Sequence, residues 1–545
     1  MKITSHQLIL ISIFFIKACG GGGIDAEQTA TPVISSASLF NVNENQTSIG
    51  IALANVASYS SALTYSLSGD DANAISINSS TGVMTFNSAP DYETKNSYAV
   101  KLNVAAGSLS TSQDITISIT NVQEPIVWVE ASPESVGMNS AKLSDAFDKA
   151  FADGTYTQAA LVIKDNKLIY ERYRGIAVNE ESAVQNSATF DTSTSVQARW
   201  GSRDKNSLVT SWSTAKSFTS ILIAIAIEQG FINSLEQSAS DFINEWANDN
   251  RNQITIRDLL DMHSGLEMIC ANSLEGPLAY CQVGRNDSDV VWFDNQLDPC
   301  INRAMATTGV THPWYSRSTF ESGYYLYSNC DSMVLGEVLF RATGKNIETY
   351  ADINLFSKIG MDAEWWQDND STSLIDGNYL SYCCIDATAR DFAKFGQLLL
   401  NNGVLDGEQI VPKSYIDKIK DIPNDTPENF KEIFPNTSYG LYFWTLQPGI
   451  IPGGPNFPPA NTIYHTLGFD GQFIIIDFTN NMLVLRNSIY QAALYRSGER
   501  KYELGADAAT SDFIASLPGG MGLEESSDFI ARNFLYDVTQ SINSD

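Results

Sequence analysis

The chain has 545 residues, enough for several domains of about 150 residues each and for a sizeable hydrophobic core. Hydrophobic residues make up 43% of it and charged residues 18%, which excludes a disordered polyelectrolyte and a collagen-like chain. Its 33 lysines and arginines against 63 aspartates and glutamates give a net charge of −30, which repels phosphate backbones, so we expect no nucleic-acid partner.

Residues 1–19 have the pattern of a secretory signal, with an apolar run over 8–16 that is too short to span a bilayer. Cys19 and the glycines after it resemble a bacterial lipoprotein processing site, although Lys17 stands where a small or apolar residue is usual. This resemblance implies lipidation of Cys19, a Gly-rich linker over 20–31 and an exported outer-membrane lipoprotein that faces the periplasm or the cell surface. Plain signal cleavage is the alternative. We expect membrane contact only through the lipid anchor.

Residues 32–124 alternate between apolar and polar side chains in the manner of half-buried strands, as at 63–67, 75–77 and 115–119. Turn signals such as Gly69-Asp70-Asp71 separate these runs, and helical periodicity is almost absent. The spacing predicts an all-β sandwich of about 90 residues.

This region resembles a single bacterial cadherin-like repeat in Val42-Asn-Glu44-Asn45, in LTYSLSGDD at 63–71 and in Pro90-Asp91-Tyr92-Glu93. The resemblance implies calcium at a repeat junction, with Glu44, Asp91 and Glu93 as the matching acidic ligands. Other ligand motifs are missing, since 57–61 contain no Asp-x-Asp. Three carboxylates are fewer than the about six to eight oxygens of a calcium shell, so carbonyls or water would have to complete it, and calcium binding stays open.

After a linker at 125–133, residues 134–545 mix helical and strand patterns and form the second predicted domain. A helix that is apolar nearly all round is expected at 217–229, and another helix is expected at 391–400. Strands are expected at 160–163, 473–476 and 482–485. We interpret this part as an α+β domain, an antiparallel sheet flanked by helices, in a multidomain chain.

Six cysteines follow Cys19, and an even number in an exported protein indicates disulfides. They are Cys270, Cys281, Cys300, Cys330, Cys383 and Cys384. Their spacing does not determine the pairing. A zinc site is the weaker interpretation, because no CxxC pair exists and three histidines follow the signal, His263, His312 and His465.

Ser213-Thr-Ala-Lys216 opens the first apolar helix, and a spacing of three places the serine and the lysine on one face of a turn. A serine hydroxyl reacts only when a base accepts its proton, and a lysine desolvated against an apolar helix can lose its charge and serve as that base. The N–H groups of the helix N-terminus can also stabilise an oxyanion. By spacing alone, a helix-capping serine and a surface lysine are the alternative. Ser202-Arg-Asp-Lys205 has the same spacing but follows Gly201 in a polar loop.

A second motif, Tyr327-Ser328-Asn329, precedes an apolar helical stretch at 333–339. A tyrosine hydroxyl beside a lysine can relay the serine proton, and an asparagine amide can hold a substrate carbonyl. A buried tyrosine with a satisfied hydroxyl is the alternative interpretation.

Together these motifs resemble the serine β-lactamase and penicillin-binding protein superfamily, in its class C β-lactamase-related branch of esterases and amide hydrolases. The likeness extends over nearly all of 130–535. It includes SPESVGM at 132–138, ITIRDLL at 254–260 leading to HSGL at 263–266, YGLYFW at 439–444 and YHTLGFDGQ at 464–472. It implies a β-lactamase/transpeptidase-like fold for the second domain.

The resemblance makes Ser213 the acylated nucleophile, Lys216 its base partner, Tyr327 a second base or acid, and Asn329 a substrate contact. Whether the lysine or the tyrosine is the acylation base is unsettled in related enzymes.

The family's third motif, Lys-Thr-Gly or His-x-Gly, corresponds without gaps to Thr466-Leu-Gly468, which makes Thr466 and Gly468 further substrate contacts. The backbone N–H groups of Ser213 and Phe469 are expected to form the oxyanion hole. His465 lies one place too early for this motif. Either a one-residue shift restores it to the motif, or it is a plain packing residue.

The sequence therefore predicts an exported serine hydrolase that acts through an acyl-enzyme on a small ester or amide and needs no cofactor for catalysis. A penicillin-binding D-Ala-D-Ala peptidase is one alternative, and a calcium-dependent adhesion protein with an inactive hydrolase domain is another. The intact Ser213, Lys216, Tyr327 and Asn329 argue against an inactive domain. His263 lies in a motif that is structural in relatives, so we expect it to cap or pack beneath the site.

Overall fold

The computed structural model describes thirteen stretches of the chain. They are 31–56, 62–92, 94–120, 126–185, 196–267, 295–305, 325, 327–368, 377–422, 439–445, 462–468, 471–489 and 529–543. The chain divides into two compact units, Met1–Val122 and Gln123–Asp545.

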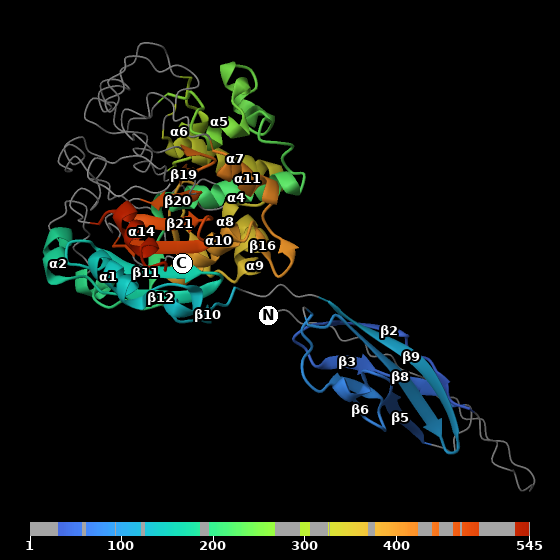
Figure 1. Ribbon diagram of the computed structural model, residues 1–545. Helices are drawn as coiled ribbons and strands as arrows, with labels where there is room; N and C mark the ends of the chain where they lie inside the picture. Colours follow the sequence, from blue (N-terminus) through green and yellow to red (C-terminus); the bar gives the residue numbers. More distant parts are fainter. Residues whose placement is uncertain are drawn as a thin grey trace, which may run out of the picture. The chain divides into compact units, whose positions relative to one another are not determined.

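The described part of the first unit consists of two facing β-sheets and a short strand pair (Figure 1). The larger sheet has the order β2 (Leu39–Asn43), β9 (Leu109–Thr120), β8 (Ser97–Ala106), β5 (Leu63–Ser68), and the smaller has β3 (Ser48–Ile51), β7 (Val83–Phe86), β6 (Ile75–Ile77). Strands β1 (Val33–Ile34) and β4 (Ala54–Asn55) pair with each other. Alternate residues such as Leu102, Val104 and Ile117 are buried between the sheets, and this unit therefore has a core of its own.

The second unit is built on a sheet that has eight strands among the described residues. Its order is β10 (Val129–Glu130), β12 (Lys167–Tyr173), β11 (Thr157–Lys164), β22 (Met482–Ser488), β21 (Gln472–Asp477), β20 (Ile463–Gly468), β19 (Phe443–Thr445), β18 (Tyr439–Gly440). Every pairing in it is antiparallel except that of β10 with β12. The strands expected at 160–163, 473–476 and 482–485 are confirmed, and they lie within β11, β21 and β22.

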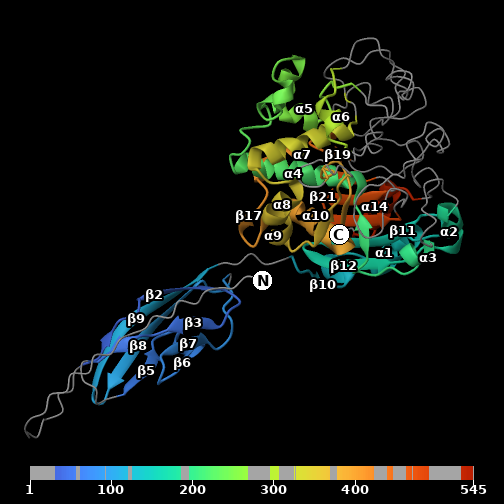
Figure 2. The ribbon, with the colours of Figure 1, turned by 180° about the vertical axis from the view of Figure 1, so that it is seen from behind.

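Helices cover both faces of this sheet (Figures 1 and 2). Val484 belongs to one core with α1 (Ser140–Ala150) and α14 (Ala531–Thr539), whereas its neighbour Leu485 belongs to the other core, with α4 (Ala215–Glu228) and α10 (Ala389–Leu400). Successive residues of a strand point to opposite faces, so these cores lie on opposite sides of the sheet. The α+β prediction for this domain is confirmed.

Helix α4 is a buried helix of the core because most of its side chains are apolar. Twelve of its 14 residues are buried, among them Lys216 in its first turn. Around it pack α5 (Ile256–Leu260), α7 (Asn329–Thr343), α8 (Ile347–Ala351), α9 (Ser357–Ile359) and α11 (Lys413–Lys420). Among the residues described, no helix has the length and apolar character that a membrane crossing requires.

A small three-stranded sheet, in the order β13 (Leu208–Thr210), β15 (Ile385–Thr388), β14 (Ala363–Trp365), leads the chain into α4. The backbone N–H of Ser211 donates to the carbonyl of Ile385 over 2.8 Å, and the Ile385 N–H donates to the Ser211 hydroxyl, also over 2.8 Å. The residues just before Ser213 are therefore held to β15.

Candidate active site

Ser213 lies in a short 3-10 turn, Trp212–Thr214, that runs directly into α4. The expected helix thus begins at Ala215, two residues after the serine. Trp212 has a φ of +48°, a region that a bulky residue rarely adopts. A backbone conformation of this kind persists only where surrounding contacts hold it. Here it places a half-buried serine just before a buried helix.

The Lys216 side chain points from the first turn of α4 to the serine and is 1% exposed, which excludes the surface-lysine interpretation. Its Nζ donates to the Ser213 hydroxyl over 3.1 Å, to Oδ1 of Asn329 over 2.8 Å and to the carbonyl of Tyr382 over 3.0 Å. Nζ thus has three polar partners, and the serine hydroxyl is the one of the three that can also donate to it.

Tyr327 flanks the lysine. Its ring centroid lies 4.8 Å from Lys216 Nζ, and its ring stacks on Trp444 at a centroid distance of 6.0 Å. Burial raises the pKa of the neighbouring Tyr439 and Tyr442 hydroxyls well above the usual value, which keeps both protonated. Tyr327 is half-buried, whereas these two phenols are buried.

Asn329 begins α7, where the Ser328 hydroxyl caps the helix by accepting from the Asp331 N–H. Asp331 in turn accepts from Ser264, in the loop after α5, over 2.9 Å. The expected helical stretch at 333–339 is confirmed within α7. Helix start and cap together direct the buried Asn329 amide at Lys216.

Thr466 reaches the serine turn from β20. Its hydroxyl accepts from Thr214 Oγ1 over 3.1 Å and from the N–H of Ile474 over 3.2 Å. Gly468, at the end of β20, lies so close to this turn that an added Cβ would be 2.2 Å from the Ser211 carbonyl oxygen. Only glycine permits this approach. Phe469 lies outside the described residues.

His465 points to the other face of β20. The ladder between β20 and β21 continues without a register shift from Ile463↔Asp477 to Gly468↔Gln472, so His465 and Thr466 face opposite ways. The His465 ring stacks on Trp444, and its burial lowers the pKa to about 4, which keeps it neutral near pH 7. These are the contacts expected of a packing residue.

His263 follows α5, and its ring meets the edge of Tyr325 at a centroid distance of 6.0 Å. The backbone N–H of His263 donates to the carbonyl of Asp258, and this hydrogen bond satisfies a carbonyl in the last turn of α5. Ser202 and Lys205, the other pair with a spacing of three, are both exposed and belong to no helix.

The structure pairs four of the predicted cysteines in two disulfides, Cys300–Cys330 and Cys383–Cys384. Cys270 and Cys281 lie outside the described residues. The Tyr382 carbonyl, which binds Lys216, was not anticipated. A backbone acceptor has no side-chain signature, and the adjacent cysteine pair was the one signal in its neighbourhood.

Two of the proposed calcium ligands bind backbone and side-chain donors of the protein itself. Glu44 accepts from the N–H of Tyr92 over 2.8 Å, and Asp91 accepts from the N–H and hydroxyl of Thr94. Glu93 and Cys19 lie outside the described residues. Within the described stretches, no group of three or more His, Cys, Asp or Glu is arranged to hold a metal ion.

A family model described as Beta-lactamase matches residues 145–488, which includes every described site residue of the second unit. The chain belongs to the Beta-lactamase family. Members of this family are serine hydrolases.

Three proteins to which this β-lactamase-family chain is similar have different names. One is a 6-aminohexanoate-dimer hydrolase of Paenarthrobacter ureafaciens, to which the chain is 22% identical over 296 residues. The aligned stretch covers 53% of this chain and 64% of that protein, so the chain matches less than two thirds of that relative's length. A penicillin-binding protein homologue from Caulobacter crescentus is 15% identical, with 73% and 97% of the two chains covered and a TM-score of 0.43. EstCE1, a hydrolase with promiscuous acyltransferase activity, is 11% identical, with 76% and 99% covered and a TM-score of 0.46.

Proposed function

We propose that this chain hydrolyses small esters or amides through an acyl-enzyme formed on Ser213. The observation that carries the proposal is the set of hydrogen bonds at Lys216. A neutral amine has two N–H groups and one lone pair, and the Asn329 and Tyr382 oxygens are two fixed acceptors for those N–H groups. The lone pair then faces the Ser213 hydroxyl, 3.1 Å away, as a general base requires.

In the proposed reaction, the Ser213 oxygen forms a bond to the substrate carbonyl carbon while its proton moves to Lys216. The tetrahedral intermediate then expels the alcohol or amine, which leaves with a proton returned through Lys216 or Tyr327. Water repeats the sequence on the acyl-enzyme, releases the acid and restores the serine. The Tyr327 ring beside the amine supports its role as a relay, and the order of the two bases stays a prediction.

The developing negative charge on the carbonyl oxygen needs backbone donors. We assign this role to the N–H groups of Ser213 and Phe469. The close approach of Gly468 to the Ser211 carbonyl supports the assignment, because it brings the end of β20 against the serine turn.

The substrate class follows from the third motif. In β-lactamases a lysine there provides a cation for the antibiotic carboxylate, whereas this chain has Thr466, whose hydroxyl is already bonded to Thr214 and to a backbone N–H. Arg486 is buried and donates to Thr157 and to the Gly471 carbonyl. We therefore propose neutral esters or amides over carboxylate-bearing β-lactams. The relative named for a 6-aminohexanoate dimer supports the amide part of this proposal, because such a dimer contains one amide bond. The preference for neutral substrates rests on the third motif alone, since that dimer also carries a carboxylate.

The test is labelling with a fluorophosphonate, because only an activated hydroxyl attacks phosphorus at a useful rate. We expect one adduct, located at Ser213 by peptide mass spectrometry and absent from Ser213→Ala. Ser202 provides the internal control, since it has the same spacing to a lysine but is exposed. An adduct at Ser202, or none in folded protein, contradicts the proposal.

For the first unit we propose a cadherin-like spacer, and for the chain an outer-membrane lipoprotein anchored at Cys19. Two disulfides in the hydrolase domain support an oxidising compartment outside the cytosol. Incorporation of a fatty-acid label that is lost in Cys19→Ser tests the anchor. Calcium titration followed by the melting temperature, with Glu44→Gln as the control, tests the metal.

A further inference from the structure

Two of the acceptors that hold the Lys216 amine are each followed in the chain by a disulfide-bonded cysteine. Asn329 precedes Cys330, and Tyr382 precedes Cys383. All four sulfur-bearing residues of the two disulfides are at most 1% exposed. The lysine amine is thus held between two chain segments that are each closed by a buried covalent bond.

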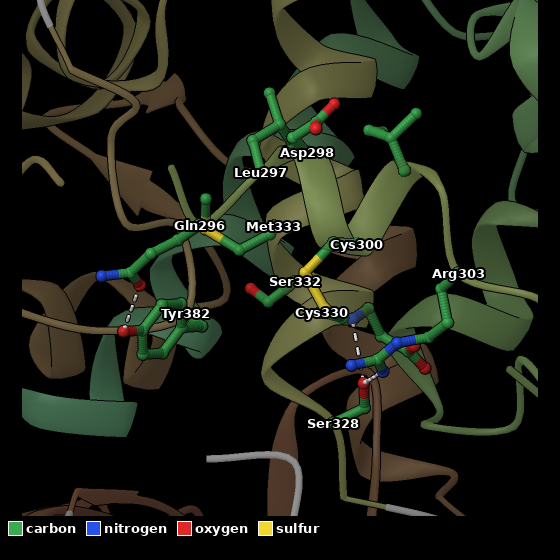
Figure 3. Close-up of a disulfide and its surroundings, with 12 residues drawn as sticks. Gln296, Leu297, Asp298, Cys300, Arg303, Ser328, Cys330, Ser332, Met333 and Tyr382 are labelled. Carbon is green, nitrogen blue, oxygen red and sulfur yellow. Dashed lines mark hydrogen bonds between the residues drawn. A yellow bond between two sulfur atoms is a disulfide. The ribbon is translucent and has the colours of Figure 1, made fainter. Parts of the chain in front are cut away.

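The first disulfide joins α7 to α6 (Asp298–Ile301), as Figure 3 shows. Just before α6, Gln296 accepts a hydrogen bond from the Tyr382 hydroxyl over 2.8 Å, also visible in Figure 3. The Tyr382 ring itself lies 5.3 Å from Lys216 Nζ. The α6 segment therefore connects the helix that carries Asn329 to the residue whose carbonyl is the other acceptor.

The second disulfide closes a ring between adjacent residues. Cys384 has a φ of +73°, its N–H donates to the Trp212 carbonyl over 3.3 Å, and its own carbonyl accepts from the N–H of Trp366. The Trp365 indole N–H donates to the carbonyls of Leu380 and Cys383. The ring closed by this disulfide thus lies between Tyr382, whose carbonyl binds Lys216, and Trp212, which precedes Ser213.

We propose that both disulfides are positioning elements for Lys216, which keep its two acceptors in place so that the lone pair points at Ser213. The inference rests on the proposed role of Lys216 as the base. A free Cys383-Cys384 dipeptide has more backbone freedom than the closed ring, and a shift of the Tyr382 carbonyl turns the amine away from the serine. A displacement of about 1 Å in such a site costs on the order of 100-fold in rate.

The experiment compares the full chain with two disulfide-free variants, C383A/C384G and C300A/C330A. Glycine at 384 tolerates the positive φ, so the first variant removes the ring without adding backbone strain. The readouts are kinact and KI for a fluorophosphonate, together with the fraction of protein that becomes labelled. We expect kinact to fall by about 10- to 100-fold with KI unchanged.

A variant that is only less stable gives a different result. A smaller fraction of its molecules is folded and becomes labelled, but kinact of the folded molecules is unchanged. Leu143→Ala is the matched control, since Leu143 is fully buried on the other face of the sheet. It should lower the melting temperature without changing kinact. Unchanged kinact in either disulfide variant overturns the inference for the disulfide that it lacks. Failure to label Ser213 in the wild type contradicts the proposed function instead.

Where a variant does not fold, opening the same bond in the wild-type protein replaces it. A dithiol reductant passes two electrons and two protons to each protein disulfide and is itself oxidised to a cyclic disulfide. Alkylation and peptide mapping identify which pair has opened. Reduced protein that keeps its folded circular dichroism and its original kinact also refutes the inference.

Discussion

The substitution Gly468→Ala tests how strand β20 and the serine turn form the site. The added Cβ would lie 2.2 Å from the Ser211 carbonyl oxygen and 2.8 Å from Cβ of Gln472, whereas ordinary contact begins at 3.4 Å. The Ser211 carbonyl cannot yield easily, because two hydrogen bonds hold this residue to Ile385. The end of β20 must therefore move by roughly 1 Å.

That displacement moves Thr466 and the end of β20, which precedes the proposed oxyanion donor in the chain, relative to the serine turn. A misplacement of about 1 Å costs on the order of 100-fold in rate, and loss of one oxyanion donor costs about 100- to 1,000-fold. We therefore expect kcat/KM for p-nitrophenyl butyrate to fall by about 100-fold or more, with a similar fall in the rate of fluorophosphonate labelling.

Gly137→Ala is the matched control. Gly137 has a φ of +73° and nothing within 4 Å of an added Cβ, so alanine there costs about 1 kcal/mol of backbone strain without any clash. It should lower the melting temperature and leave kcat/KM unchanged. A folded Gly468→Ala protein whose kcat/KM is within about threefold of the wild type would refute the reasoning, because the close approach would then play no part in catalysis.

Lys216→Ala and Tyr327→Phe should each slow fluorophosphonate labelling by about 100-fold or more, and an unchanged rate removes that residue from the mechanism. Kcat/KM for p-nitrophenyl butyrate should exceed that for nitrocefin by at least about tenfold, since Thr466 offers a carboxylate a neutral hydrogen bond in place of an ionic one. Equal values would contradict the proposed substrate class. Burial raises the pKa of Asp386 from 3.8 to about 6, so the folded state holds this proton more tightly and stability falls as pH rises between those values. The urea midpoint of the wild type should therefore fall more between pH 4 and pH 7 than that of Asp386→Asn, and equal falls would show that Asp386 does not contribute.

The contact between Ser213 and Lys216 could be predicted from the sequence because it is local. Residues three apart share a face of any helical turn, and an apolar helix must be buried with whatever its first turn carries. The α+β class was predictable for a related reason, since strand and helix periodicities depend on neighbouring residues in the chain. The expected β11, β21, β22, α4 and α10 accordingly agree with the structure to within a few residues.

Tertiary structure alone decided what surrounds that pair. The two other acceptors of Lys216 are 113 and 166 residues away in the chain, and one of them is a backbone carbonyl that any residue type provides. The strand pairing between β20 and β21 decided which residue of the third motif faces the serine turn. A register change of one residue would exchange the faces of His465 and Thr466. Cysteine spacing likewise could not pair the disulfides, since pairing depends on which segments the folded core brings within bonding distance.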